Sequence, residues 1–259
     1  MPRNKSLLKK TAAILMVFSA IICVGIIMTY ISHSFNYLVA VVSKTVRLVP
    51  VYKVDTQQKA IAISFDASWG AEHTLDILDI LDKYDVKATF FLVNIWLEDY
   101  PAIACEIAAR GHEIGLHSAT HPHCTQISQT QLEKELTDNF NMIKETTGYT
   151  ARLFRPPFGD YNNTVISTAQ SLGYTPVQWS IDSLDWKDLS AQEIQSRVLK
   201  KLSAGDIVLF HNNGKHTAES LEPILQEIIN NRGLSVITMS ALLLQGNYYI
   251  DTAGVQHAK

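Results

Sequence analysis

Two histidines in the pattern His117-x-x-x-His121 are the residues whose types and spacing point most directly to chemistry. They follow residues 112–116, an apolar run short enough to be a buried strand. Residues four apart lie on one face of a helical turn, so the two imidazoles can converge on one metal ion. A catalytic metal site needs three protein ligands and a water, so this pair alone is incomplete. The alternative interpretation is that one or both are ordinary surface or capping histidines.

A carboxylate and a further histidine stand at the ends of other apolar runs. Asp66 lies in residues 64–70 (SFDASWG), where a carboxylate beside a metal-bound water can act as a general base. Its structural alternative is to cap the following helix. His211 ends residues 207–211 (IVLFH), where it is either a general acid or a satisfied structural histidine.

Two loops add an arginine and a pair of acids. Residues 154–159 (FRPPFG) form a stiff loop, because two prolines fix φ and a glycine allows a tight turn. Arg155, held in that loop, can orient a carboxylate bidentately, whereas on the surface it would simply be solvated. Residues 181–186 (IDSLDW) combine Asp182 and Asp185 with an indole able to stack on a sugar ring, or else form a solvated turn.

The rest of the chain alternates between strand-like and helix-like segments that would position these residues. The runs at 51–54 and 60–65, separated by residues 55–59, predict a hairpin. Ser190-x-x-Glu193 predicts a capping box at the start of one helix. Further strands are predicted at 88–93, 112–116, 152–154, 175–179, 206–210 and 234–238, and helices at 75–84, 101–110, 132–146, 161–172, 190–202, 218–230 and up to about 244. This order predicts a parallel sheet, open or closed into a barrel, with reactive residues where strands end.

The bulk composition allows one sizeable α/β domain plus extras. The chain has 259 residues, of which 47% are hydrophobic and 18% charged, so a buried core is expected. A net charge of −3 gives no reason to expect nucleic acid as a partner. The three cysteines form neither a CxxC motif nor an even disulfide framework.

The N-terminus predicts attachment to a membrane. Residues 11–31 contain no charged residue and follow a stretch that includes Arg3, Lys5, Lys9 and Lys10. About 20 apolar residues are enough to cross a bilayer, and the basic flank places the N-terminus in the cytoplasm. A cleaved signal peptide competes, but its apolar core is usually shorter and no A-x-A-like site follows. We therefore predict an uncleaved, single-pass transmembrane helix in the cell membrane, with the remainder extracytoplasmic.

Taken together, the motifs resemble those of the NodB-homology polysaccharide deacetylases, carbohydrate esterase family four. The resemblance covers about residues 51–244, and it rests on five segments in order: SFD at 64–66, HSxxH at 117–121, RPPFG at 155–159, DxxDW at 182–186 and LFH at 209–211. The FDxSWG variant and the anchored layout are most similar to the sporulation deacetylases of spore-forming bacteria.

This resemblance implies a fold, a reaction and a cofactor. The expected fold is a distorted (β/α) barrel of about seven strands, preceded by the transmembrane helix. The expected reaction removes N-acetyl groups from an aminosugar polymer, peptidoglycan or a related glycan, with a divalent metal such as Zn²⁺ or Co²⁺. The expected division is a cytoplasmic N-terminus and anchor (1–32), a connector (33–50), the deacetylase domain (51–246) and a C-terminal tail (247–259).

The resemblance also implies a role for each site residue. The residues with implied roles are Asp66 as base, His211 as general acid, Arg155 orienting Asp66, Asp185 tuning His211, His117 and His121 as metal ligands, and Trp186, Pro157 and Phe158 as substrate-binding residues.

One position departs from the family pattern. The first motif normally has two adjacent aspartates, the second being the third metal ligand, but here that place is Ala67. A methyl group cannot coordinate a metal, so the site should bind it weakly. Either Glu72 or His73, a turn further on, reaches the gap or waters fill it, and Glu72 is the better candidate for a substitute ligand. Alternatively, the protein is a non-catalytic glycan-binding or morphogenetic protein on a deacetylase scaffold, although such a scaffold has no need of the retained acid–base set.

Overall fold

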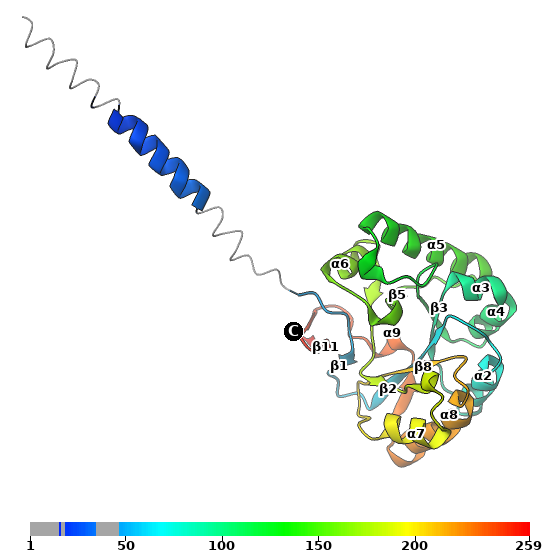
Figure 1. The fold of residues 1–259 in the computed structure, drawn as a ribbon. Helices are drawn as coiled ribbons and strands as arrows, with labels where there is room; N and C mark the ends of the chain where they lie inside the picture. The colour runs from blue at the N-terminus through cyan, green and yellow to red at the C-terminus, as the bar shows by residue number, and fades with distance from the viewer. Residues whose placement is uncertain (1–15, 17–18, 35–46) are drawn as a thin grey trace, which may run out of the picture. The chain divides into compact units, whose positions relative to one another are not determined.

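The computed structural model describes residue 16 and residues 19–34 and 47–259. The chain divides into two units, 1–46 and 47–259, and the described part of the first is helical (Figure 1). Among the described residues, no helix has both the length and the apolar character to span a bilayer. The predicted anchor over 11–31 and the connector over 33–50 lie partly outside those residues.

The second unit is built around a parallel sheet with the order β6-β5-β4-β3-β2-β8-β7, and β9 pairs alongside β2. Its strands are β2 (Ala60–Ala67), β3 (Thr89–Leu92), β4 (Glu113–Leu116), β5 (Leu153–Phe154), β6 (Thr175–Pro176), β7 (Ile181–Asp182), β8 (Ile207–His211) and β9 (Ser235–Ile237). Within residues 47–259 no ladder joins β6 to β7, the two ends of the path. The strands therefore form an incomplete barrel, which confirms the predicted distorted (β/α) architecture.

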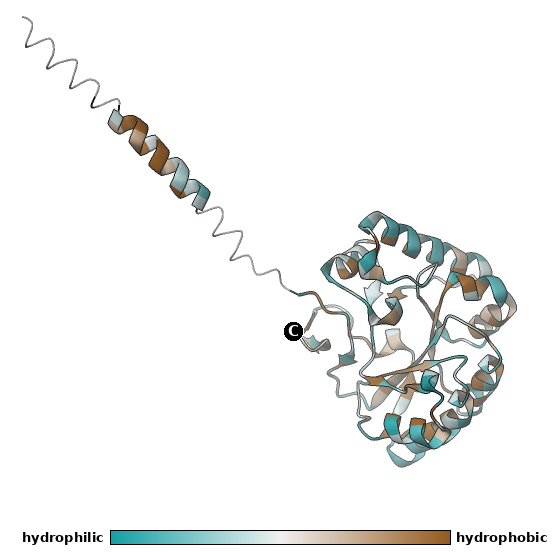
Figure 2. Ribbon diagram, viewed as in Figure 1, coloured by the Kyte–Doolittle hydropathy of each residue, from teal (hydrophilic) through white to brown (hydrophobic). Residues whose placement is uncertain are grey.

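Helices surround these strands on the outside (Figure 1). The outer helices are α2 (Thr74–Lys83), α3 (Asn94–Asp99), α4 (Pro101–Ala109), α5 (Gln129–Thr147), α6 (Asn163–Ser171), α7 (Ala191–Leu199) and α8 (Thr217–Gln226). The short helix α9 (Met239–Leu242) lies instead at the centre of Figure 1, where Met239 and Leu242 join the second hydrophobic cluster. Figure 2 shows polar and apolar residues along the same helices, as expected of helices with one buried face. The predicted capping box at Ser190 and Glu193 is present at the start of α7.

The alternation of side chains along β2 decides which residues face the site. All eight residues of β2 are buried. Ile63 and Phe65 belong to the main hydrophobic cluster with the helices, whereas Ala62 belongs to a second cluster on the other face. Because successive strand residues point to opposite faces, Ser64 and Asp66 share the face of Ala62.

The predicted hairpin between residues 51–54 and 60–65 is wrong. Both edges of β2 are occupied, by β8 on one side and by β9 and then β3 on the other, so no edge remains for the preceding segment. Instead, β1 (Lys53–Val54) pairs with β11 (Val255–Ala258), which pairs with β10 (Tyr248–Ile250). Residues 247–259, expected only as a tail, thus supply two strands of a second sheet.

Candidate active site

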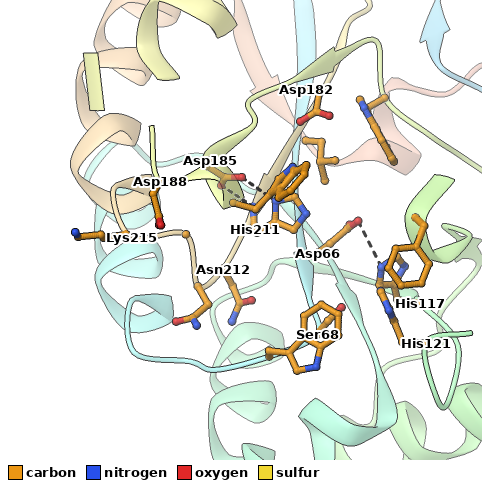
Figure 3. A pocket seen from close by; sticks show the side chains of 17 residues that line it. Asp66, Ser68, His117, His121, Asp182, Asp185, Asp188, His211, Asn212 and Lys215 are labelled. Carbon is orange, nitrogen blue, oxygen red and sulfur yellow. Dashed lines mark hydrogen bonds and ion pairs between the residues drawn. The ribbon is translucent and has the colours of Figure 1, made fainter. Parts of the chain in front are cut away.

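The predicted reactive residues line one pocket of about 550 Å³ (Figure 3). The predicted residues that line it are Asp66, His117, His121, Asp185, His211, Phe158 and Trp186. They come from β2, from β8 and from loops after β4, β5 and β7. Because these strands are parallel, their carboxyl ends open to the same side and bring residues distant in sequence together.

Asp66 is held by a fully buried arginine. Arg155 Nη1 donates to Asp66 Oδ1 at 2.6 Å, and Arg155 Nη2 donates to Ser64 Oγ at 2.8 Å and to the Gln178 carbonyl at 3.1 Å. The predicted bidentate contact is therefore wrong, because only Nη1 donates to Asp66, whereas Nη2 donates to Ser64 and to the Gln178 carbonyl. Burial raises the pKa of Asp66, but Arg155, His117 and His211 outweigh it and hold this pKa below its usual range. Asp66 is thus a carboxylate at neutral pH.

His117 presents an unprotonated nitrogen to the pocket. Its Nδ1 lies 2.7 Å from the Arg155 carbonyl, which can only accept, so we assign the hydrogen to Nδ1. Its Nε2 lies 3.5 Å from Asp66 Oδ2. Burial lowers the pKa of His117, and burial together with nearby positive charge lowers that of His121 to about 3. Both imidazoles are therefore neutral, the form that binds metals.

The two histidines converge through a turn, and the helical explanation given by their spacing is wrong. Their ring centroids lie 5.0 Å apart. Residues 117–123 are not helical, and Ser118 and His121 adopt left-handed φ values of 71° and 55°. Glu135 of α5 secures the turn by accepting from the backbone N–H groups of Ala119 and Thr120.

The donor set does not fit a complete three-ligand metal site. Ala67 is fully buried and offers no oxygen. Glu72 is exposed and is not among the residues that line the pocket, so its proposed place as substitute ligand is not supported. Across the part of the chain that the structure describes, no group of three or more His, Cys, Asp or Glu side chains could hold a metal ion. His121 Nδ1 is buried without a hydrogen-bond partner among those same residues.

His211 forms a tight pair with Asp185. His211 Nδ1 donates to Asp185 Oδ1 at 2.7 Å, and the His211 backbone N–H donates to Oδ2 at 2.8 Å. Thr217 Oγ1 donates to Oδ2 at 2.6 Å. Burial lowers the pKa of His211, but the hydrogen bond and charge of Asp185, aided by Asp66 and Asp182, raise it above its ordinary value. The imidazolium is therefore favoured at this position.

Sequence reasoning gave no role to Thr217 or Trp69, and it misplaced Pro157. Thr217 is the first residue of α8, where a threonine carries no signal of a contact with Asp185. Trp69 lines the pocket and is 62% exposed. Its position three residues after Asp66 could have predicted its place at the site. Phe158 and Trp186 are each 57% exposed at the pocket, whereas Pro157 is buried and does not line it.

Asp66 and His211 have pKa values shifted in opposite directions, and these shifts indicate which group is the base and which is the acid. Asp66 is held as the ionised carboxylate and His211 is favoured as the cation. Pairs of groups whose environments separate their pKa values in this way commonly serve as base and acid. The arrangement suits a hydrolysis in which water loses one proton and the leaving group gains one.

Comparison with known proteins agrees with this chemistry. A family model described as polysaccharide deacetylase matches residues 53–177. A peptidoglycan-N-acetylglucosamine deacetylase of Bacillus cereus is 34% identical over 74% of this chain and 92% of its own length. The chain belongs to the polysaccharide deacetylase family. The uncharacterized protein YlxY of Bacillus subtilis is also 34% identical, over 75% of this chain but only 60% of its own length.

Solved structures of this family are similar in fold. A carbohydrate esterase family 4 pseudoenzyme from Bacillus anthracis superposes with a TM-score of 0.72 at 31% identity, covering 75% of this chain and 68% of its own. A mutant of that pseudoenzyme with restored enzymatic activity gives a TM-score of 0.72 at 32% identity, covering 75% of this chain and 71% of the mutant chain. The family therefore contains both active and inactive proteins with this architecture.

Proposed function

We propose that this deacetylase-family chain hydrolyses N-acetyl groups from an aminosugar polymer, peptidoglycan or a related glycan. The observation that carries the proposal is the pairing of Asp66 with Arg155 and of His211 with Asp185 around one pocket. A protein that only bound glycan would have no need to separate the pKa values of these two groups.

In the proposed reaction, Asp66 accepts a proton from the water that attacks the acetyl carbon. Arg155 keeps Asp66 ionised and fixes its direction. His211 then gives its proton to the nitrogen, which is otherwise a poor leaving group, as the carbon–nitrogen bond breaks. Acetate and the free amine are the products.

The test is acetate release by the full chain from peptidoglycan fragments and chitooligosaccharides, with added Zn²⁺ or Co²⁺. We expect release by the wild type and a loss of about 100-fold or more for Asp66→Asn, which removes the base. Tyr249→Ala is the control, because Tyr249 is exposed outside the pocket. An inactive wild type with metal present would contradict the proposal.

The proposed cofactor is a divalent metal, Zn²⁺ by preference, held weakly by His117 and His121. Ala67→Asp restores the missing carboxylate, and we expect it to raise the zinc content of the purified chain by about 10-fold or more. Little change would mean that another ligand already completes the site.

The proposed location is the cell membrane, with the domain extracytoplasmic and a role in sporulation or cell-wall modification. The uncharged segment over 11–31 and the likeness of FDxSWG to the sporulation deacetylase PdaB support this part of the proposal. Alkaline phosphatase, which folds only outside the cytoplasm, should be active when fused to the C-terminus. An inactive fusion would contradict the orientation.

A second candidate is a non-catalytic glycan-binding or morphogenetic protein, which Ala67 and the similarity to a pseudoenzyme favour. This candidate predicts that Asp66→Asn leaves the cellular phenotype of the wild type intact, whereas the enzyme predicts the phenotype of a deletion.

A further inference from the structure

Trp69 is a large apolar side chain that is exposed to solvent at the pocket of Asp66 and His211. It lies in the loop between β2 and α2, lines the pocket and is 62% exposed. Its neighbour Ser68 is only 7% exposed, so the exposure belongs to the indole and not to the loop as a whole. Leaving an indole in water forgoes the free energy that burying it would contribute.

The backbone that follows Trp69 is held by contacts of Gly70. The Gly70 carbonyl accepts from Trp96 Nε1 at 2.7 Å and from Asn212 Nδ2 at 2.9 Å. Gly70 has a φ of +61°, and a Cβ there would lie 2.3 Å from Asn213 Nδ2. The loop is therefore closely packed, and Trp69 is presented in one place before any ligand arrives.

The indole also has a fixed contact with the pocket wall. Its ring meets that of His121 edge to face, with centroids 4.9 Å apart and an interplanar angle of 72°. This contact places the indole next to the residues around Asp66, while most of the indole surface remains exposed to solvent.

Two other exposed aromatic side chains, Phe158 and Trp186, line the same pocket from separate loops. Four phenylalanine, tyrosine or tryptophan side chains are exposed in residues 47–259, and of these Tyr249 alone does not line the pocket. Trp69, Phe158 and Trp186 follow β2, β5 and β7 respectively, so the exposed aromatic side chains reach the pocket from three separate strand ends.

We propose that Trp69 is a stacking platform for a second sugar ring, next to the one whose acetyl group faces Asp66. The C–H face of a pyranose is apolar and packs on an aromatic face, while its hydroxyl groups remain hydrated at the open rim. The preferred ligand is therefore an N-acetylated oligosaccharide and not a single sugar. This inference rests on the proposed glycan substrate, but it requires no catalysis.

Binding of chitotetraose and of N-acetylglucosamine to the full chain in detergent, measured by calorimetry, tests the proposal. We expect Trp69→Ala to bind the tetramer about 5- to 10-fold more weakly, and Trp69→Phe, which keeps an aromatic face, to stay within about 3-fold of wild type. The monosaccharide should bind far more weakly than the tetramer and lose little on Trp69→Ala. Tyr249→Ala is the matched control and should bind both as the wild type does.

The proposal is overturned if Trp69→Ala binds the tetramer as tightly as the wild type, or if the wild type binds no oligosaccharide. Far-ultraviolet circular dichroism of each variant shows whether a weaker affinity comes from loss of fold. Acetate release is measured in parallel, so the two hypotheses can fail separately. Tight binding that depends on Trp69 without acetate release would refute the enzyme and support the platform.

Discussion

Asp66 and His211 depend on partners that are themselves held rigidly. Arg155 reaches Asp66 while its other nitrogen is engaged by Ser64 and Gln178, and its guanidinium carbon lies 4.1 Å from the Phe91 ring centroid. A buried charge needs this kind of enclosure, because an unpaired guanidinium or carboxylate in the interior costs several kcal/mol. The chemistry of the site therefore depends on residues that no substrate would touch.

Asp185→Asn should lower the pKa of His211, because the amide supplies no negative charge to the imidazolium. Titration of the His211 ring by nuclear magnetic resonance in chelator-treated protein measures this directly. If His211 is the general acid, the alkaline limb of acetate release should also move to lower pH. Thr217→Ser is the control, since it keeps the hydroxyl that donates to Asp185. An unchanged His211 pKa in Asp185→Asn would refute the assignment.

The same contact links stability to pH with a definite sign. The folded-state pKa of His211 is raised, so the pair stabilises the fold fully below the ordinary value of about 6.5. The contribution is lost as the pH rises through the folded-state pKa. Asp185→Asn should therefore cost more stability at pH 5.5 than at pH 9, as measured by urea unfolding.

At the scale of elements, the close packing of β3 and β4 supports the arginine. Gly115 in β4 lies opposite Phe91 in β3, and a Cβ at Gly115 would lie 2.4 Å from the Phe91 ring. The glycine therefore makes room for the ring that Arg155 covers. A glycine in β4 thus leaves room for the aromatic ring against which the buried guanidinium of Arg155 packs.

Gly115→Ala should destabilise the fold by about 1–3 kcal/mol, because the added methyl displaces Phe91. The control is Gly115→Ala combined with Phe91→Leu, which removes the ring that the methyl meets. The effects of the two substitutions should be non-additive by about 1 kcal/mol or more in urea unfolding. Additive effects would show that the methyl is accommodated in another way.

At the scale of the molecule, residues 47–259 form a unit with its own core. The buried residues of both hydrophobic clusters fall within it, and β1, β10 and β11 join its two chain ends in one sheet. His257 adds to this closure, with Nδ1 at 3.0 Å from Asp55 and Nε2 at 3.2 Å from Asp251. A hydrophobic core of its own is what a domain needs in order to fold independently.

Removal of residues 1–46 should therefore leave a chain that unfolds cooperatively. We expect its urea midpoint, followed by circular dichroism, to match that of the full chain in the same detergent. Further removal of residues 247–259 should lower the midpoint, since β1 loses its partner strand. A non-cooperative transition for residues 47–259 would contradict the division into units.

The amino-acid sequence by itself determined the alternation of strands and helices, the family, and which residue types stand at strand ends. These are local properties, because hydrophobic period, capping residues and strand-end motifs are written in neighbouring residues. The gathering of Asp66, His117 and His211 in one pocket, with Arg155 bonded to Asp66, follows from them, since parallel strands share a carboxyl edge.

Only the tertiary structure decided which groups these residues contact. Segments distant in the chain decide the left-handed turn at His121 and the single hydrogen bond from Arg155 to Asp66. They also decide the hydrogen bond from Thr217 to Asp185 and the exposure of Glu72. The pairing of β1 with β11 has the same origin, because an edge is available or filled only once the other strands are in place. Local sequence patterns predict which groups can react. Long-range packing decides their hydrogen-bond partners, their pKa values and which side chains can serve as metal ligands.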